Sequence, residues 1–531
     1  MLVFAMRCCE YLIESILNWV LSIVSVSARV LNRWLATFQM LGLRPLLPPQ
    51  YSPLGVPFMS KNSNARIEKD SLGPVRVPAE AYYGPETARA VDNFPISGIR
   101  PLPEFLKATI LVKKAATEAN LSLGLLDEKV GRAIASAADE ILNGALHDQF
   151  VVDVFQAGAG TSHNMNANEV LANRAIEILG GRKGDYKLVS PHDHVNMGQS
   201  TNDTYPTFIR VASVLMAKPL IGAVASLKQS FDEKAKEFDR IVKSGRTHLQ
   251  DAGAIRLGQE FAAWARNLED DLQTVQNAVD KLLELNLGGT AVGTGLNADP
   301  TYVKLAVENL SKYTGFKFRV ARNYAALMQS MADFVTFSAA LRTLSVDLTK
   351  IANDLRLMSS GPVTGIGEIT LPAVQPGSSI MPGKVNPSIA EMLNMVCFEV
   401  IGNDVTIMMA AQASQLELDV MMPVIAYDLT QSLLILTNAI RVFNERLVKG
   451  IKANEERCTA LLEKSAGIAL ALNPFIGYEK AAEVAKEALA RGAPLRQVVL
   501  EKGLLSAAQL DEILDPFAMT TPGVHGKEKK K

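Results

Sequence analysis

The stretch from Leu257 to Leu283 reads LGQEFAAWARNLEDDLQTVQNAVDKLL, and its large apolar residues recur every three or four positions. This spacing places them on one face of an α-helix that is roughly 40 Å long. The side chains on this stripe are Leu257, Phe261, Trp264, Leu268, Leu272, Val275, Val279 and Leu282. An apolar stripe of this length is buried only when other helices pack along it, so the segment predicts a helix bundle.

Four further segments predict additional long helices. Apolar side chains recur at helical spacing from Leu220 to Phe238 and from Leu327 to Leu355, and two more helical stretches cover Ile389 to Ala413 and Pro423 to Leu447. The sequence Met408-Met409-Ala410-Ala411 combines methionines with small residues, which favours burial on more than one side and association of bundles into an oligomer. We therefore predict an all-α fold with a central five-helix bundle.

The chain is too long for a single hydrophobic core, because it has 531 residues and a mass of 57.5 kDa. Changes in pattern predict four parts: an N-terminal extension at 1–58, an N-terminal helical domain at 59–201, the central bundle at 202–456 and a small C-terminal domain at 457–531. The last part contains a turn at Asn473-Pro474 and two short helices, and it ends in a solvated basic tail from Lys527 to Lys531.

The first 58 residues allow three interpretations. The uncharged run from Ser15 to Ala28 is shorter than the ~20 residues that span a bilayer, so a membrane-spanning helix is disfavoured. A secretory signal or an amphipathic targeting segment is the second interpretation, although Glu10 and Glu14 oppose a signal. We favour a third, in which translation starts at Met59 and residues 1–58 are untranslated or disordered.

Composition excludes several classes of protein. Hydrophobic residues make up 48% and charged residues 21%, which is typical of a soluble globular protein, and the net charge of −1 argues against nucleic acid as a partner. Four cysteines without CxxC spacing predict neither a disulfide framework nor a metal site, and they fit a reducing cytoplasm.

Four polar segments interrupt the helices, and helix packing does not explain them. They are GAGTSHNMNANE at 158–169, HVNMGQSTND at 194–203, GRTHLQD at 245–251 and QPGSSIMPGKVNP at 375–387. Each by itself is compatible with helix capping, a packed histidine or a connecting loop. Together, at the ends of long helices, they could converge on one pocket whose neutral donors and the cation of Lys384 suit a small dicarboxylate.

The loop from Gly377 to Pro387 resembles the signature loop of the aspartase/fumarase superfamily. The segments around Thr161, Ser200 and Thr247, and GTGLN at 293–297, resemble that family in order and spacing, and the resemblance runs from about Arg66 to the C-terminus. It implies three mostly α-helical domains with a central five-helix bundle. It also implies a homotetramer in which three subunits contribute to each active site.

The resemblance carries substrate-binding roles to individual residues of this chain. It places Ser200, Thr201 and Thr247 at the β-carboxylate, and Lys384 and Asn386 at the α-carboxylate. The ammonium group would meet Thr161, Asn202 and His248.

Ser378 is the general base by the same resemblance, with His248 and Lys384 as further catalytic residues. Because an ordinary hydroxyl is a weak acid, backbone N–H groups of the loop and Lys384 are expected to stabilise its alkoxide. Gly377 and Gly383 are expected hinges of the loop, and Glu391 is expected to orient His248.

One position departs from the family pattern. His163 stands beside Thr161 where relatives carry an apolar residue, and it either packs in the core or alters substrate preference.

The expected reaction is reversible deamination of L-aspartate to fumarate and ammonia, by Cβ proton abstraction through an enediolate intermediate. Thr201 and the segments at 81–84, 415–418 and 473–474 resemble the aspartase form of the family. This resemblance favours deamination over hydration of fumarate to L-malate by a class II fumarate hydratase, which stays as the alternative. Lyases of larger amines fit these segments poorly. A catalytically silent relative would not need both Ser378 and Lys384, which are present.

We expect no redox or organic cofactor and no bound metal, and the sequence leaves activation by a divalent cation open. The expected partners are a small dicarboxylate and further copies of the chain.

Overall fold

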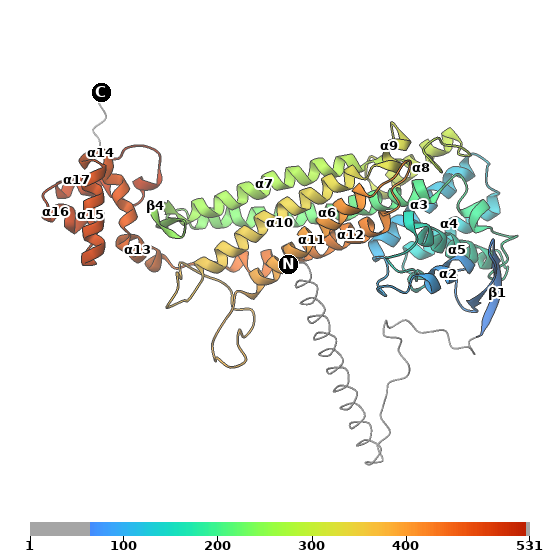
Figure 1. Cartoon of the computed structure of the whole chain (residues 1–531), viewed down its shortest axis with the longest axis horizontal. Coiled ribbons are helices and arrows are strands. Elements are labelled where there is room, and N and C mark those ends of the chain that lie inside the picture. The colour runs from blue at the N-terminus through green and yellow to red at the C-terminus, as the bar shows by residue number, and fades with distance from the viewer. Residues whose placement is uncertain (1–63, 527–531) are drawn as a thin grey trace, which may run out of the picture. The chain divides into compact units, whose positions relative to one another are not determined.

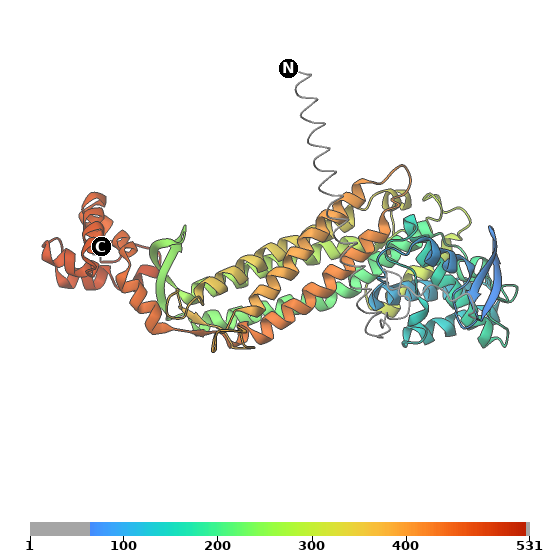
Figure 2. The same ribbon diagram turned by 60° about the horizontal axis from the view of Figure 1, so that its bottom comes forward.

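Five long helices run along a common direction and confirm the predicted bundle (Figure 1). They are α6 (Thr201–Glu237), α7 (Leu257–Leu282), α10 (Ala332–Met358), α11 (Ser388–Gln412) and α12 (Met422–Arg446). Figure 2 shows the same alignment from a second direction. The computed structural model describes residues 64–526, so the expected extension at 1–58 and the basic tail at 527–531 lie outside the described residues.

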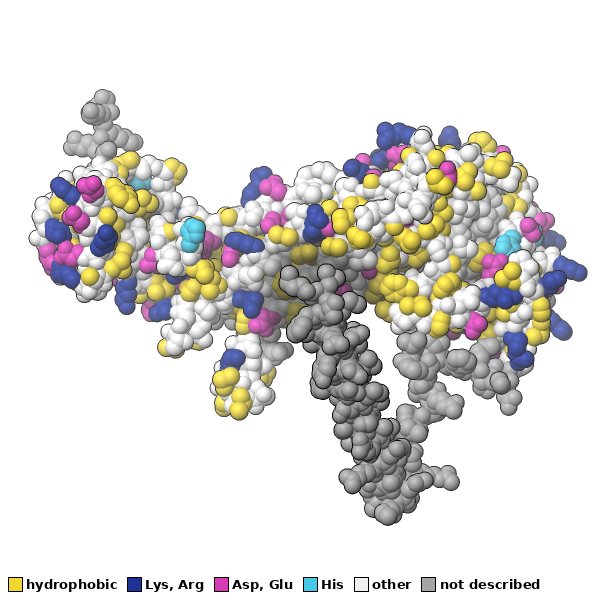
Figure 3. Space-filling view, in the orientation of Figure 1, with side chains coloured by type: hydrophobic (Ala, Val, Ile, Leu, Met, Phe, Trp, Pro, Cys, Tyr) yellow, Lys and Arg dark blue, Asp and Glu magenta, His cyan; other side chains and the backbone are white. Residues whose placement is uncertain are grey.

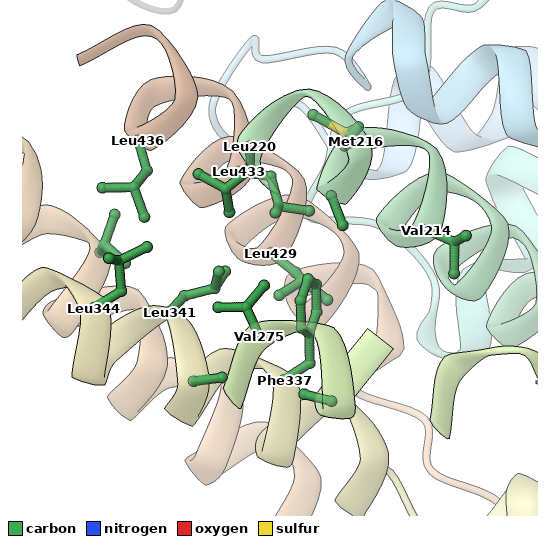
Figure 4. Close-up of a cluster of buried hydrophobic side chains, with 14 of the residues drawn as sticks. Val214, Met216, Leu220, Val275, Phe337, Leu341, Leu344, Leu429, Leu433 and Leu436 are labelled. Atoms are coloured by element: carbon green, nitrogen blue, oxygen red, sulfur yellow. The ribbon is translucent and has the colours of Figure 1, made fainter. Parts of the chain in front are cut away.

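The apolar stripes meet in the middle of the bundle. Val275 on α7, Phe337 and Leu341 on α10, and Leu429 and Leu433 on α12 point toward one another (Figure 4), and each is at most 2% exposed. Burial of one such side chain stabilises the fold by about 1.5–3 kcal/mol, so the stripes supply the main drive for assembly of the bundle.

The third predicted stripe is divided between two helices. The short helix α9 (Tyr324–Gln329) is followed by Ser330, whose backbone is extended (φ −124°, ψ 122°). Helix α10 begins only at Ala332. The expected helix start near Leu327 was therefore wrong. Spacing alone did not reveal the break because Met331, which lies in it, is buried like a helical stripe residue.

The N-terminal part combines four helices with a β-hairpin that the sequence did not predict. Strands β1 (Ala65–Asp70) and β2 (Gly73–Pro78) pair antiparallel, with Ala65 opposite Pro78. The helices are α2 (Pro85–Asn93), α3 (Pro103–Ser122), α4 (Glu128–Leu142) and α5 (Thr161–Ile178). Helix α3 joins two cores, since Phe105 packs with the bundle and Ile110 packs with α4 and α5.

The connections between the bundle helices contain short strands and one further helix. They are the antiparallel pair β3 (Val242–Thr247) and β4 (Gln250–Arg256), the parallel pair β5 (Glu284–Leu285) and β6 (Arg319–Val320), helix α8 (Pro300–Thr314), and the antiparallel pair β7 (Ile369–Thr370) and β8 (Lys452–Ala453).

The C-terminal part contains more helices than the two expected. They are α13 (Glu455–Lys464), α14 (Asn473–Ile476), α15 (Tyr478–Arg491), α16 (Leu495–Glu501) and α17 (Ala507–Ile513). Leu472, Val484, Val498 and Leu510 form their own apolar core. Several of these helices are one or two turns long, which is too short for a repeating apolar stripe.

Helices α6 and α11 are long and apolar enough to cross a membrane by length and composition. The apolar window of α6 is 67% buried inside the protein, as expected for a core helix of a bundle, whereas that of α11 is 39% buried.

Candidate active site

Ser200 and Asp203 fix the start of α6. The Ser200 hydroxyl accepts a hydrogen bond from the backbone N–H of Asn202, and the Asp203 carboxylate accepts one from the N–H of Ser200 at 3.0 Å. The same carboxylate accepts N–H groups of Gly288 and Thr290, both at 2.9 Å. Burial raises the pKa of Asp203 to about 7, against the effect of these N–H donors. Hydrogen bonds at the start of α6, and those from Gly288 and Thr290 to Asp203, therefore fix the segment 200–202.

A buried polar group that the sequence analysis missed lies beneath this segment. We call it the Lys113 cluster: Lys113, Asn164, Asn168, Asn196 and Gln199. The Asn196 side-chain oxygen accepts hydrogen bonds from Lys113 Nζ (3.1 Å), Asn164 (3.3 Å) and Asn168 (3.1 Å), and Gln199 accepts a second from Lys113 (2.9 Å). Asn164 also donates to the Thr201 hydroxyl at 3.0 Å. The cluster thus ties a predicted substrate-binding residue to a buried lysine.

Desolvation dominates the electrostatics of Lys113. Burial lowers its pKa to about 7, while the Asp203 carboxylate opposes the shift. A signal was present in the sequence, because Lys113 shares the helical spacing of Leu106 and Ile110 and so lies on the buried face of α3.

Thr161 is the first residue of α5 and is exposed. The preceding Gly160 has φ +83°, and a Cβ there would lie 2.1 Å from the Tyr205 ring, so the entry to α5 requires glycine. Asn164, one turn further along α5, contacts Thr201. The structure therefore brings the Thr161 segment and the Ser200–Asn202 segment together, and Asn202 is fixed by donating to the carbonyl of Ala291 at 2.8 Å.

His163 packs in the core and does not face solvent. It is fully buried against the Phe105, Tyr205 and Phe208 rings, and its Nε2 lies 2.9 Å from the Thr109 hydroxyl. Burial lowers the pKa of His163 to about 3, so the ring is neutral at neutral pH. Of the two expected roles, packing is the one that this geometry supports.

Thr247 and His248 lie at the tip of the β3–β4 hairpin. His248 and Leu249 have φ values of +55° and +60°, as the two central residues of a tight hairpin turn require. Thr247 is paired with Gln250, and Thr247, His248 and Leu249 are all exposed. The hairpin therefore presents both predicted site residues to the outside of its own chain.

The loop that carries Ser378 joins β7 to α11 and is closed by hydrogen bonds of its own. Gly377 N–H donates to the Lys384 carbonyl at 2.7 Å, and the Asn386 side chain donates to the Gly377 carbonyl at 2.7 Å. A Cβ at Gly377 would lie 2.6 Å from Asn386 N and from Lys384 O, so close approach of the two loop arms requires this glycine. Gly383 has φ +79°, a backbone conformation that also favours glycine.

Ser378 has the local geometry expected for a stabilised oxyanion. Its Oγ accepts hydrogen bonds from the backbone N–H groups of Ile380 (3.2 Å) and Met381 (2.8 Å). Two fixed donors aimed at one oxygen favour negative charge on it. Lys384 is exposed on the same loop. Glu391 lies in the first turn of α11, and among residues 64–526 it makes no hydrogen bond or ion pair with His248.

A single chain holds the predicted site residues in separate places. Thr161 and Ser200–Asn202 lie with α5 and α6 at one end of the bundle, whereas the Thr247–His248 hairpin lies at the other end, beside β4 (Figure 1). The Ser378 loop projects from the bundle ahead of α11, with apolar side chains at its tip (Figure 3). Residues 64–526 contain no group of three or more His, Cys, Asp or Glu side chains that could hold a metal ion.

Comparisons with known proteins agree with this architecture. A lyase family profile matches residues 73–402, and a profile for the fumarase C C-terminus matches residues 468–521. An aspartate ammonia-lyase from Bacillus sp. is 50% identical over 467 residues, which cover 88% of this chain and 100% of that protein.

Two solved structures have the same fold. A crystal structure described as fumarate lyase:delta crystallin from Brucella melitensis, bound to cobalt, matches with a TM-score of 0.83 at 49% identity over 86% of this chain and 100% of that one. A class II fumarase from Schistosoma mansoni also has a TM-score of 0.83 and the same coverage of both chains, at 34% identity. The chain therefore belongs to the lyase family that includes the aspartate ammonia-lyases.

Proposed function

We propose that this protein is an aspartate ammonia-lyase, a carbon–nitrogen lyase that converts L-aspartate reversibly into fumarate and ammonia. The observation that carries the proposal is the 50% identity to an aspartate ammonia-lyase over the whole length of that relative. The class II fumarase has an equally similar backbone but only 34% identity, so the side chains, and not the fold, favour ammonia as the leaving group.

Ser378 removes the proton from Cβ of L-aspartate in this proposal. The electron pair of the C–H bond passes into the β-carboxylate, which becomes an enediolate with two negative charges. The enediolate electrons then form the Cα–Cβ double bond as the C–N bond of the ammonium group breaks. Nitrogen keeps the electron pair of that bond and leaves as ammonia. The N–H groups of Ile380 and Met381, at 3.2 and 2.8 Å from Ser378 Oγ, support this role because they stabilise the alkoxide that acts as the base.

Hydroxyl and amide donors hold the substrate carboxylates. Ser200, Thr201 and Thr247 bind the β-carboxylate, and Lys384 and Asn386 bind the α-carboxylate. The bonds that hold Ser200 to Asp203 and Thr201 to Asn164 support the first assignment, because fixed donors stabilise the growing charge of an enediolate without reorganising. Thr161, Asn202 and His248 take the ammonium group, and Glu391 orients His248 from another chain.

A homotetramer completes the site, with three subunits contributing to each pocket. Two observations support it. The predicted residues lie at opposite ends of one bundle, and α11 exposes a row of apolar side chains that includes Met395 (63%), Phe398 (57%), Val405 (52%) and Met409 (53%). Packing of α11 against other copies would remove this apolar surface from water.

The reaction needs no redox or organic cofactor, since every electron pair stays within the substrate or leaves with ammonia. We place the enzyme in the cytoplasm. The buried free thiols of Cys397 and Cys458 support a reducing compartment.

The test is an assay of the purified protein with L-aspartate and, separately, with L-malate, followed by the ultraviolet absorbance of fumarate. We expect fumarate from L-aspartate and none above background from L-malate. Fumarate from L-malate alone would overturn the proposal in favour of the fumarate hydratase alternative.

A further inference from the structure

Four charged side chains form a buried group below the Thr247–His248 turn, and we call it the Glu368 quartet. It consists of Lys243 and Arg246 on β3, Glu260 on α7, and Glu368 just before β7. Glu368 Oε1 lies 2.8 Å from Arg246, its Oε2 lies 3.0 Å from Lys243, and Lys243 lies 2.9 Å from Glu260. Glu368 is fully buried and Lys243 is 2% exposed.

The backbone fixes Glu368 independently of its side chain. Its N–H donates to the Met358 carbonyl at 2.9 Å, at the end of α10, and its carbonyl accepts from the N–H of Asn454 at 2.9 Å. The next two residues form β7, which pairs with β8. The Ser378 loop begins directly after this strand, so the carboxylate of Glu368 is attached to the root of that loop.

The tip of the hairpin is exposed, although the body of its strands packs against α13 and the segment Ala466–Leu472. Thr247, His248 and Leu249 are exposed, and the strand register shifts between Ser244 and Arg246, where the ladder is interrupted. Arg246 directly precedes Thr247, and its guanidinium reaches Glu368. An ion pair of this kind, shielded from water, is strong and directional, so it fixes the position of the residues beside it.

We propose that Glu368 is a positioning residue. It holds the Thr247–His248 turn against the end of α10 and the start of β7, so that the turn keeps a fixed position when it meets the substrate. This inference rests on the proposed function, because it assigns the geometry of the same site. It adds a residue that touches no reacting atom and acts through Arg246 and Lys243.

The experiment is a double-mutant cycle of Glu368→Gln with His248→Ala, measured as kcat and KM with L-aspartate. Glu368→Gln keeps the shape of the side chain but leaves Arg246 and Lys243 without their shared carboxylate. We expect it to lower kcat/KM at least about tenfold, as displacement of a substrate-contacting group does. In the His248→Ala background the same change should lower kcat/KM by a smaller factor, because one of the two substrate-binding residues of the turn has already been removed.

Asp404→Asn is the matched control. Asp404 is a buried carboxylate on α11 paired with Arg342 on α10 at 2.6 Å, and it contacts neither the hairpin nor the loop. Its effect on activity should be the same factor with and without His248→Ala. Equal factors for Glu368→Gln in both backgrounds would overturn the inference and leave Glu368 with a structural role.

Arg246→Lys provides the second variant, in case Glu368→Gln does not fold. It keeps the charge but loses the planar contact with Glu368. In the same cycle with His248→Ala, non-additive losses support the inference and additive losses refute it. An inactive wild-type protein would instead refute the proposed function, so the two failures are distinguishable.

Discussion

The two ends of the bundle present their predicted site residues in different ways. At the end with α5 and the start of α6, Thr201 is 9% exposed, and Ser200, Thr201 and Asn202 are each fixed by a hydrogen bond within the chain. At the other end, Thr247 and His248 occupy an exposed turn, and the Ser378 loop exposes Ile380 (84%) and Met381 (50%). At the first end, contacts within one chain fix the predicted site residues. At the second end, the side chains point outward and can contact another molecule.

The difference separates two physical requirements of the proposed reaction. Donors that stabilise an enediolate must not move, and Ser200 and Thr201 meet this requirement at a helix start fixed by a core. The base must act in a space without water, so it belongs on a loop that a second surface can cover. The exposed apolar side chains at the loop tip suit such a cover.

The largest expected effect concerns Ser378 itself. Ser378→Ala should lower kcat by about a thousandfold or more, because it removes the proposed general base, while the proposed tetramer should stay intact. The assay is fumarate formation, with size-exclusion chromatography and light scattering for the assembly. Ser379→Ala is the control, since the neighbouring hydroxyl is exposed and should matter little. Wild-type rates for Ser378→Ala would show that another group takes the proton.

Mixed tetramers test the separation of the two ends directly. We expect Ser378→Ala and Thr201→Ala chains, each nearly inactive alone, to regain activity when they are co-expressed. If Ser378 and Thr201 reach each site from different subunits, random assembly restores about a quarter of the sites. Differently tagged chains allow isolation of the hybrids before the assay. No recovery would mean that one chain supplies both residues, and the comparison of the two ends would lose its meaning.

The free energy of unfolding should depend strongly on the Lys113 cluster, which lies at the end of the bundle with α5. Asn196→Ala removes an oxygen that accepts three donors of the Lys113 cluster, so it should lower the free energy of unfolding by roughly 3 kcal/mol. Asn444→Ala is the control, because Asn444 is 2% exposed and makes one side-chain bond, to Ser226. Urea denaturation measures both variants. Equal losses would show that the cluster has no special role in stability.

The smallest effect is a pH dependence from His163. Its pKa is about 3 in the folded state and 6.5 in the reference state, so below pH 6.5 the unfolded chain binds a proton that the folded chain does not. Folding should therefore lose about 2 kcal/mol between pH 7 and pH 5 through this residue. Over the same interval, the free energy of unfolding of His163→Leu should fall by about 2 kcal/mol less than that of the wild type. Denaturation of both proteins at each pH measures this difference. An unchanged pH slope would mean that the buried ring is protonated.

The bundle was predictable because each long helix repeats apolar residues at helical spacing along its buried face, and a long helix contains many such repeats. The stripe on α7 and the two stretches that became α11 and α12 were each placed to within a few residues. The hairpin of β1 and β2 and the short C-terminal helices were missed, since segments of four to seven residues carry too few repeats to show a period. The polar segments were singled out because helix packing does not explain them, and the roles predicted for their residues came from a family resemblance.

The sequence by itself determined which residues face a helical core and which polar segments interrupt it, because both are properties of neighbours along the chain. Only the tertiary structure decided that Lys113 lies beneath Thr201, that His163 is buried in an aromatic cluster, and that Glu368 reaches β3 from more than a hundred residues away. These contacts join side chains that are distant in sequence. Their energies depend on burial and on partners that no local pattern records.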